Sequence, residues 1–341
     1  MLLSSLLLCN TIAIVASPRP RQPRSSIRAH LPQFQLGPGD ARTPKSAVVS
    51  DSLRLLEWDK VCDAVSSFAG TPFGREATKE RLWQVDLSYE RSLKMLEETT
   101  AAVEMIKYGA GGLDFSGIDV VLVKSATDRV SRGLPIDGME AKAVVSLIEF
   151  SENLQIILKT AVKEDADWFN RFMPLTQMIL DYTISRSFVK AAQQVLDEDG
   201  SVKDNASTDL KRSRDQVRAL ERKLYQLMDK LMRNEKNEAS SLEMCNVNGR
   251  WCLKTMDAEY AKFDGLLLSG GSGVGGIIEP IAAVPLNDEL QNAMALAAKA
   301  EEEVLSRLTD KMLAELDAIQ LLVQTIIELD AEVEKHVLAL Q

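Results

Sequence analysis

Apolar residues between positions 52 and about 196 recur with the three- and four-residue spacing of amphipathic helices, and short breaks separate the segments. Ser52 is placed to cap a first helix, whose apolar positions are Leu53, Leu56, Val61, Val65 and Phe68. The pattern predicts a body of packed helices, and no residue in it marks a chemical site.

Several helix starts in this region carry recognisable capping residues. Thr71-Pro72 is typical of a helix start, because proline is tolerated at the first helical position. Asp86-Leu87-Ser88 precedes a further helix. Asp137, followed by Glu140, matches a capping box ahead of a helix that extends to about Val162.

A heptad pattern follows the turn that Asp197-Glu198-Asp199-Gly200 predicts, and Ser207 is placed to cap its helix. Its apolar positions are Leu210, Val217, Leu220, Leu224, Leu227 and Leu231. Such a seam predicts one long arm, running to about Asn237, that packs on a partner helix.

Residues 242–285 change character and predict a small antiparallel sheet. Asn248-Gly249, between MCNV and RWCLKTM, is typical of a tight hairpin. FDGLLLS, a glycine cluster and IIEPIAAV follow. Residues 286–341 contain no glycine or proline, so a single returning arm would be about 84 Å long at 1.5 Å per residue.

The predicted fold is therefore mostly α, with a long two-helix arm that carries a small antiparallel β tip. Aromatic residues make up only 5% of the chain, which favours helices over a β-sandwich or barrel. We assign residues 51–200 to a helical core, 201–290 to the arm and β tip, and 291–341 to the returning helix.

The charge of the chain opposes general affinity for nucleic acid, because its formal net charge is −10. Binding to phosphates would need a local basic surface. Between Lys203 and Lys236, ten basic residues face six acidic ones. These cations either contact nucleic acid or form ion pairs with the acidic helix predicted over residues 286–341. The sequence supports the two interpretations equally.

Candidate contacts to a nucleic-acid backbone lie on the arm and at the tip. On the arm they are Lys211, Arg214, Arg218 and Arg222. At the tip they are Arg250, Lys254 and Lys262, beside Trp251 and Tyr260. An ordinary half-buried hairpin explains the tip residues nearly as well.

The sequence contains few of the motifs that are typical of enzyme active sites. Gly271–Gly276 satisfies the spacing G-x-G-x-x-G, but Ile277-Ile278-Glu279-Pro280 follows instead of a helix, so the run is interpreted as a hairpin loop. There is no P-loop motif, only two histidines, and no C-x-x-C pair among four cysteines. We predict no catalytic residue, no metal site and no cofactor site. The carboxylates at 301–303 and at 330, 332 and 334 are interpreted as solvated helix faces.

The first fifty residues resemble an organelle transit peptide, because no acidic residue precedes Asp40 while serine, proline and arginine recur. This composition predicts a chloroplast location. The alternative is a secretory signal, since Leu2–Ala16 is apolar, although no positive charge precedes it. A membrane anchor is not expected, because about 15 apolar residues fall short of the ~20 that span a bilayer.

Several segments, taken in order, resemble the second MutS family, whose full-length members carry a helical core, a MutS-type ATPase and an Smr nuclease domain. The matching segments are Leu56-Glu57-Trp58-Asp59-Lys60-Val61, Ala69–Glu76, Leu196–Ser207 with Leu210 and Arg214, Asn248-Gly249-Arg250 with Lys254 and Ala258-Glu259-Tyr260, and Ile278-Glu279-Pro280 with Leu286–Leu290. The resemblance covers about residues 52–330.

The resemblance implies the lever and clamp of a DNA repair and recombination-suppressing protein. It also implies binding to mismatched or branched DNA, or to a ribosome, and the predicted plastid targeting fits a plant member of the family. The family uses ATP and magnesium, yet the chain lacks the motifs of the ATPase and nuclease domains, so we expect a product truncated before the ATPase. The Lys254-Thr255-Met256-Asp257 segment lacks the family's proline.

The competing hypothesis is a helical interaction module that dimerises through the heptad seam, with itself or with a full-length relative.

Overall fold

The computed structural model describes residues 47–85, 87–107, 114–164, 167, 177, 179–180, 185–234, 242–255, 263–271 and 274–333. The predicted transit peptide lies outside these residues except for its last four positions, and the chloroplast location remains a prediction. Lys262 and Tyr260 also lie outside the described residues. None of the helices within the described ranges is long and apolar enough to cross a membrane.

The contacts divide the chain into two compact units that are interleaved along the sequence. One unit comprises residues 1–120, 150–182 and 322–341, and the other comprises residues 121–149 and 183–321. Two long helices, α7 (Gly138–Glu164) and α13 (Leu316–Val333), contribute residues to both units.

The first unit contains four helices near the start of the described residues, and the first of them differs from the sequence prediction. The helices are α2 (Ala47–Leu55), α3 (Trp58–Ser66), α4 (Pro72–Leu82) and α5 (Tyr89–Lys107). The single helix expected from Ser52 to Phe68 is wrong, because Glu57 adopts a left-handed conformation (φ 50°) that separates α2 from α3. Ser52 does not cap a helix: it lies inside α2, and its hydroxyl donates to the Val48 carbonyl.

A buried carboxylate links segments from both ends of the sequence in this unit. Asp330 is fully buried, so the prediction that it lies on a solvated helix face is wrong. Asp330, on α13, accepts hydrogen bonds from the Gly70 and Thr71 amides at 3.0 and 2.9 Å, and from the Thr71 hydroxyl. The predicted cap is confirmed, since Thr71 Oγ1 accepts from the Gly74 amide at 3.0 Å. A Cβ atom at Gly74 would overlap the Asp330 carboxylate, so this position requires glycine. Burial raises the pKa of Asp330, and the hydrogen bonds oppose that shift.

The second unit begins with α6 (Val120–Ser131) and the N-terminal half of α7, and the predicted capping box is present. The Glu140 amide donates to Asp137 Oδ1 at 2.8 Å, and the Asp137 amide donates to Glu140 Oε2 at 3.0 Å. Then follow α10 (Ser187–Val195), a turn closed by the Leu196–Val202 bridge, and the 3-10 helix η1 (Asp204–Ala206).

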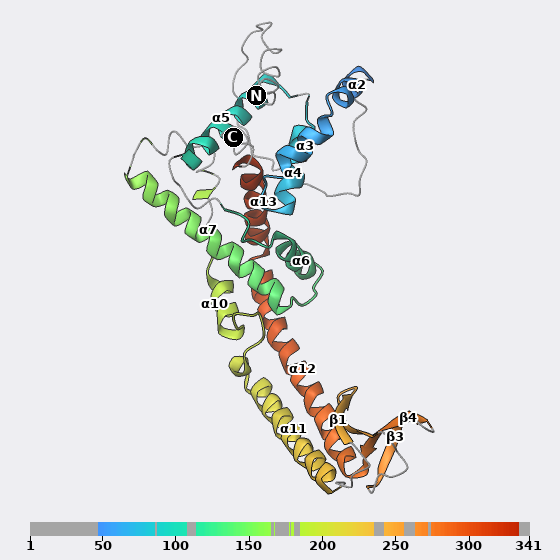
Figure 1. The fold of residues 1–341 in the computed structure, drawn as a ribbon. Coiled ribbons are helices and arrows are strands. Elements are labelled where there is room, and N and C mark those ends of the chain that lie inside the picture. Colours follow the sequence, from blue (N-terminus) through green and yellow to red (C-terminus); the bar gives the residue numbers. More distant parts are fainter. Residues whose placement is uncertain are drawn as a thin grey trace. The chain divides into compact units, whose positions relative to one another are not determined.

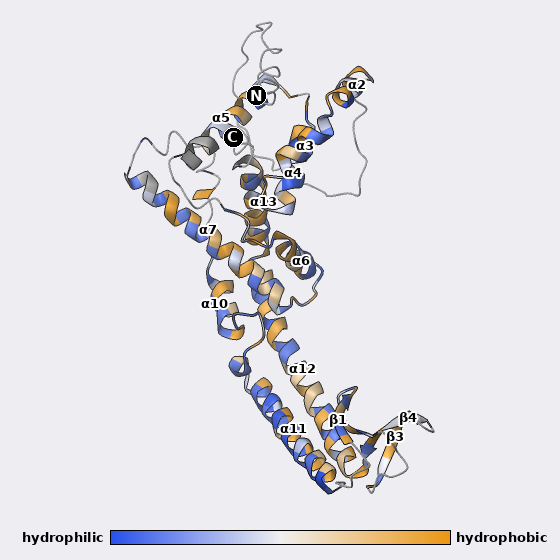
Figure 2. Cartoon of the chain, viewed as in Figure 1, coloured by the Kyte–Doolittle hydropathy of each residue, from blue (hydrophilic) through white to orange (hydrophobic). Residues whose placement is uncertain are grey.

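The predicted arm is confirmed as the pair α11 (Thr208–Asn234) and α12 (Val284–Leu313), which run side by side (Figure 1). Ser207 Oγ accepts from the Leu210 amide at 3.0 Å and caps α11. The buried residues of α11 are Leu210, Leu220, Leu224 and Met228. Figure 2 shows the hydrophobic residues of α11 on its inner side and hydrophilic residues along its outer side.

The returning segment is two helices rather than one. α12 ends at Leu313 and α13 begins at Leu316, although no glycine or proline separates them. The chain tightens at this point, because the Glu315 amide donates to the Met312 carbonyl, three residues back. Ser185 Oγ donates to the Glu315 carboxylate at 2.9 Å and holds the turn from outside.

Four antiparallel strands form the predicted sheet, in the order β1-β2-β4-β3. Their bounds are β1 (Leu242–Val247), β2 (Arg250–Thr255), β3 (Gly265–Gly271) and β4 (Val274–Pro280), and the 3-10 helix η3 (Ile281–Ala283) leads into α12. Asn248 and Gly249 have φ of 53° and 80°, which confirms the predicted hairpin. The glycine cluster connects β3 to β4, so it forms a hairpin and opens no helix.

We predict that Asp330→Asn lowers the free energy of unfolding by about 1–3 kcal/mol, because an amide cannot accept all three hydrogen bonds and leaves a buried donor unpaired. Urea unfolding measures the change. Asp310→Asn, at an exposed position on α12, should stay within about 0.5 kcal/mol of the parent chain. Equal stabilities of the two variants would contradict the assigned role of Asp330.

Candidate nucleic-acid interface

The outer side of α11 carries a basic face. The helix holds eight basic and four acidic residues, whereas α12 holds three basic and six acidic ones. Five exposed cations form no ion pair with any described residue, and we call them the α11 basic face: Lys211, Arg212, Arg222, Lys223 and Lys230. At about 100° per residue they fall within about 120° of arc, opposite the buried Leu220 and Leu224.

Two of the predicted arm residues are held by carboxylates. Arg214 bridges Asp204 at 2.7 Å and Glu301 of α12 at 2.9 Å, and also donates to the Val202 carbonyl. Arg218 bridges Asp204 at 2.9 Å and Asp215 at 2.7 Å. Hydrogen bonds from Arg214 and Arg218 lower the pKa of Asp204 below its usual range. These two arginines therefore fix the base of the arm.

The sequence also allowed the cations of the arm to form ion pairs with the acidic returning helix. Among the described residues, one cation of α11 does so. Arg214–Glu301 is the ion pair between α11 and α12 that the described residues form. The α11 basic face points away from α12, which leaves its positive charge toward solvent. Two of the four predicted arm residues, Lys211 and Arg222, belong to this face.

A buried polar network attaches the sheet to the arm. Arg250, at the start of β2, donates to both oxygens of Glu279 on β4 at 2.7–3.1 Å, and to Asp288 of α12 at 2.8 Å. Asn287, which is fully buried, accepts from the Trp251 amide at 2.9 Å and donates to the Trp251 carbonyl at 3.0 Å. Its amide group also donates to Glu279 Oε1 at 2.7 Å.

The network explains two of the motifs that carry the family resemblance. The Asn248-Gly249-Arg250 turn supplies the cation, and the segments around Glu279 and Asn287 supply its partners. The Glu279 side chain is only 4% exposed, so its charge needs the guanidinium beside it. Hydrogen bonds to Glu279 and Asp288 raise the pKa of Arg250 further above its ordinary value.

The structure consequently changes the interpretation of the predicted tip residues. Arg250 already binds two carboxylates, so its replacement by glutamate would disrupt the sheet and cannot report on phosphate contact by itself. Lys254 is exposed on β2, with 55% of its side chain accessible, and forms a long ion pair with Glu243 at 4.0 Å. Lys262 falls beyond what the structure describes.

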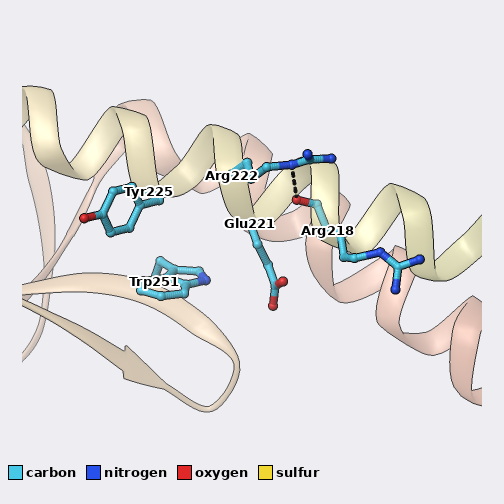
Figure 3. Close-up of a pocket in the computed structure, with 5 residues that line it drawn as sticks. All are labelled: Arg218, Glu221, Arg222, Tyr225 and Trp251. Carbon is cyan, nitrogen blue, oxygen red and sulfur yellow. Dashed lines mark hydrogen bonds between the residues drawn. The ribbon is translucent and has the colours of Figure 1, made fainter.

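An open pocket of about 460 Å³ lies between α11 and β2. Its lining residues are Arg218, Glu221, Arg222, Tyr225 and Trp251. Figure 3 shows Tyr225 and Trp251 on either side of the gap, with Glu221 reaching toward the strand and both arginines extending along the helix. The Tyr225 side chain is largely exposed, and the buried indole N–H of Trp251 has no hydrogen-bond partner among the described residues.

Sequence reasoning missed several of these residues for identifiable reasons. The basic stretch between Lys203 and Lys236 included Arg212, Lys223 and Lys230. Their positions on a helical wheel would have placed them on a different side of α11 from the paired arginines. Tyr225 interrupts no pattern, and only its position across the pocket from Trp251 of β2 marks it. The partnership of Arg250 with Glu279 spans 29 residues, and local spacing carries no trace of it.

Metal ligands and reactive cysteines are the remaining candidates for chemistry among the described residues. No group of three or more histidine, cysteine, aspartate or glutamate side chains there is arranged to hold a metal ion. Cys252 is fully buried, and burial raises its thiol pKa to about 11, which makes it a poor nucleophile.

The chain is similar to bacterial proteins named Endonuclease MutS2, and no family model matches it. The Synechocystis protein is 24% identical over 267 residues, which cover 78% of this chain and 31% of that protein. The Exiguobacterium sibiricum protein is 24% identical over 284 residues (82% and 35%), and the Thermus thermophilus protein 29% identical over 269 (76% and 32%). The chain thus spans about a third of the length of these curated relatives.

We predict that Arg250→Met destabilises the protein by about 3–5 kcal/mol, because it leaves the buried Glu279 carboxylate without its cation. Asp288→Asn removes only the exposed partner and should cost less than about 1 kcal/mol. Urea unfolding compares the two. The double variant Arg250→Met with Glu279→Met should recover part of the loss; no recovery, or equal losses in the two single variants, would refute the network's role.

Proposed function

We propose that this chain, which belongs to the MutS2 family, grips nucleic acid through the α11 basic face, as the clamp arm of a DNA repair and recombination protein. The observation that carries the proposal is the separation of charge on the arm. Five of the eight cations of α11 are exposed and form no ion pair with a described residue, whereas Arg214, Arg218 and Arg233 are paired with carboxylates.

The chemistry of this face fits a phosphate backbone. Lysine and arginine side chains spaced along about 30 Å of helix, from position 211 to position 230, match a polyanion better than a single small anion. Because such contacts reach phosphates and not base edges, they are independent of sequence and weaken steeply as salt rises. The acidic α12 keeps the opposite side of the arm free of nucleic acid.

The β tip extends this surface only modestly. Lys254 is the exposed cation of the tip that the structure describes, and Arg250 serves the attachment of the sheet. We therefore place the main contact on the arm, with Lys254 and Lys262 as secondary contacts. Mismatched or branched duplex DNA is the proposed partner, and ribosomal RNA is the alternative, since both present the same phosphates.

The wider setting of the protein belongs to the same proposal. The relatives are named as endonucleases, and the chain spans about a third of their length. ATP hydrolysis, nuclease activity and a chloroplast location are proposals that depend on the family resemblance and on residues 1–50. No catalytic, metal or cofactor role is proposed for the residues that the structure describes.

The heptad seam supports an interaction module less well than it supports an arm. Leu220, Leu224 and Met228 pack within the chain against Leu253 of β2 and Leu290 of α12, so the seam is already filled. Leu224→Asp would unfold the arm instead of separating a dimer. Dimerisation with itself or with a full-length relative would need a different surface.

Charge reversal on the α11 basic face tests the proposal. We predict that Arg212→Glu, Lys223→Glu and Lys230→Glu together reduce affinity for duplex DNA, and reduce the slope of log K against log salt by about 2 to 3, near 0.9 for each lost phosphate contact. Fluorescence anisotropy with a labelled duplex at several salt concentrations measures both quantities.

The matched control places the same change of charge on the other helix. Lys299→Glu, Arg307→Glu and Lys311→Glu are exposed on α12, and this triple variant should leave the salt slope unchanged. Equal losses in the two triple variants would mean that only the net charge matters, and the basic face would lose its assigned role.

A further inference from the structure

We propose that the pocket between α11 and β2 binds one unpaired base of a nucleic-acid strand, with the phosphate of that nucleotide on Arg222. The inference rests on the proposed function and deepens it, because it adds a site for single-stranded or extruded nucleotides beside the phosphate-binding face. The pocket is lined by Tyr225, Trp251, Glu221 and Arg222, with Arg218 as the fifth residue.

The pocket offers aromatic surface where the arm would otherwise present only charge. Tyr225 lies on α11 four and three residues after Glu221 and Arg222, so these side chains share one side of the helix. Tyr225 is 56% exposed, so its ring is open to a ligand. Trp251 forms the facing wall from β2, where it packs against the apolar core of the arm.

Its size and hydrogen-bonding groups suit a nucleobase. The volume of about 460 Å³ falls within the range of about 300–1,000 Å³ typical of small-molecule sites. Trp251 lines the pocket with its indole ring, which offers a stacking surface for a base. Glu221 supplies an acceptor for a base amino group, the pairing known for carboxylates with cytosine.

The charges define which part of a nucleotide enters. Glu221 repels phosphate from the depth of the pocket, whereas Arg222 lies at its edge and uses one nitrogen to bond the Arg218 carbonyl at 3.1 Å. The remaining guanidinium N–H groups of Arg222 are available to a phosphate, since Arg222 forms no ion pair with a described residue. Arg218 is less available, because Asp204 and Asp215 hold it.

The base must be unpaired. A base inside a duplex has both faces stacked on its neighbours, and insertion between two protein side chains requires that it leave the stack. Stacking on aromatic side chains tolerates any base, so the strand would be recognised by its single-stranded character more than by its sequence. Branch points and strand ends supply such bases next to duplex that the α11 basic face can hold.

The test uses the full chain with fluorescein-labelled (dC)8, the matching (rC)8, and a blunt duplex. We expect Tyr225→Ala to weaken binding of the single strands by about tenfold or more and to leave duplex binding unchanged. Tyr225→Phe keeps the ring and should bind within about twofold of the parent chain. The (dC)8 and (rC)8 arms show whether DNA or RNA is the preferred source of the base.

Arg222 has a close control on the other helix. Arg222→Gln should weaken single-strand binding and lower the salt slope by about 0.7. Arg307→Gln should change neither, although Arg307 is also exposed and also bonds the carbonyl four residues before it, at 3.2 Å. Glu221→Gln should alter the preference between (dC)8 and (dT)8, which a purely structural role would not change.

The outcomes separate this inference from the proposed function. If the protein binds duplex and Tyr225→Ala leaves single-strand binding intact, the proposal of a base-binding pocket is wrong. The role of the α11 basic face in duplex binding would then still hold. Absence of binding to every probe at low salt overturns both. Loss of single-strand binding in Tyr225→Ala, with Tyr225→Phe active and duplex binding retained, is the result that supports the pocket.

Discussion

The attachment of the small sheet to the arm depends on one buried carboxylate, Glu279, held by Arg250 and Asn287. A small sheet needs a hydrophobic face or a helix to pack against, and this sheet packs on the helices of the arm. Apolar contacts around Leu224 and Leu253 bury surface between the sheet and the arm. The polar network fixes the orientation of the sheet, because its hydrogen bonds tolerate little change in the angle between β2 and α12. The facing wall of the pocket, Trp251, is placed by the two bonds between its backbone and Asn287.

The arm illustrates how the same residue types divide between structure and recognition. Arginines near its base are satisfied by Asp204 and Glu301, and they bring no free charge to the surface. The unpaired cations extend from Lys211 to Lys230 on the side of α11 opposite the apolar seam. Pairing a basic helix with an acidic one would stabilise the arm over a long distance, yet only one such bridge is present between the described residues of α11 and α12. The remaining positive charge is consistent with a surface kept for a polyanion.

Elements governed by local chemistry were predictable from the sequence. Thr71-Pro72, the Asp137–Glu140 box, Ser207 and the Asn248-Gly249 turn all act within a few residues, and each is confirmed. The break at Glu57 was missed, because no glycine or proline marks it; Trp58 contributes by donating its indole N–H to the Leu82 carbonyl, a contact across two helices. The interruption at residues 314–315 escaped for the same reason.

The candidate site was less accessible to sequence reasoning. The number of cations identified the arm in the sequence. Only the fold shows that Lys211 and Arg222 are exposed without an ion-pair partner among the described residues, whereas Arg214 and Arg218 are paired. The tip residues were chosen by charge, and Arg250 has a structural partner 29 residues away. Pairings of that span are set by the fold, so they lie outside what spacing can reveal.

Photo-crosslinking tests the central claim, that nucleic acid lies along α11, most directly. A photoreactive side chain in place of Lys223 reports on the α11 basic face, and the same side chain in place of Glu302, exposed on α12, reports on the opposite side of the arm. The account predicts crosslinks to duplex DNA from position 223 that fade as salt rises, and few from position 302. Crosslinks mainly from position 302, or from neither position while the chain binds duplex, would contradict it.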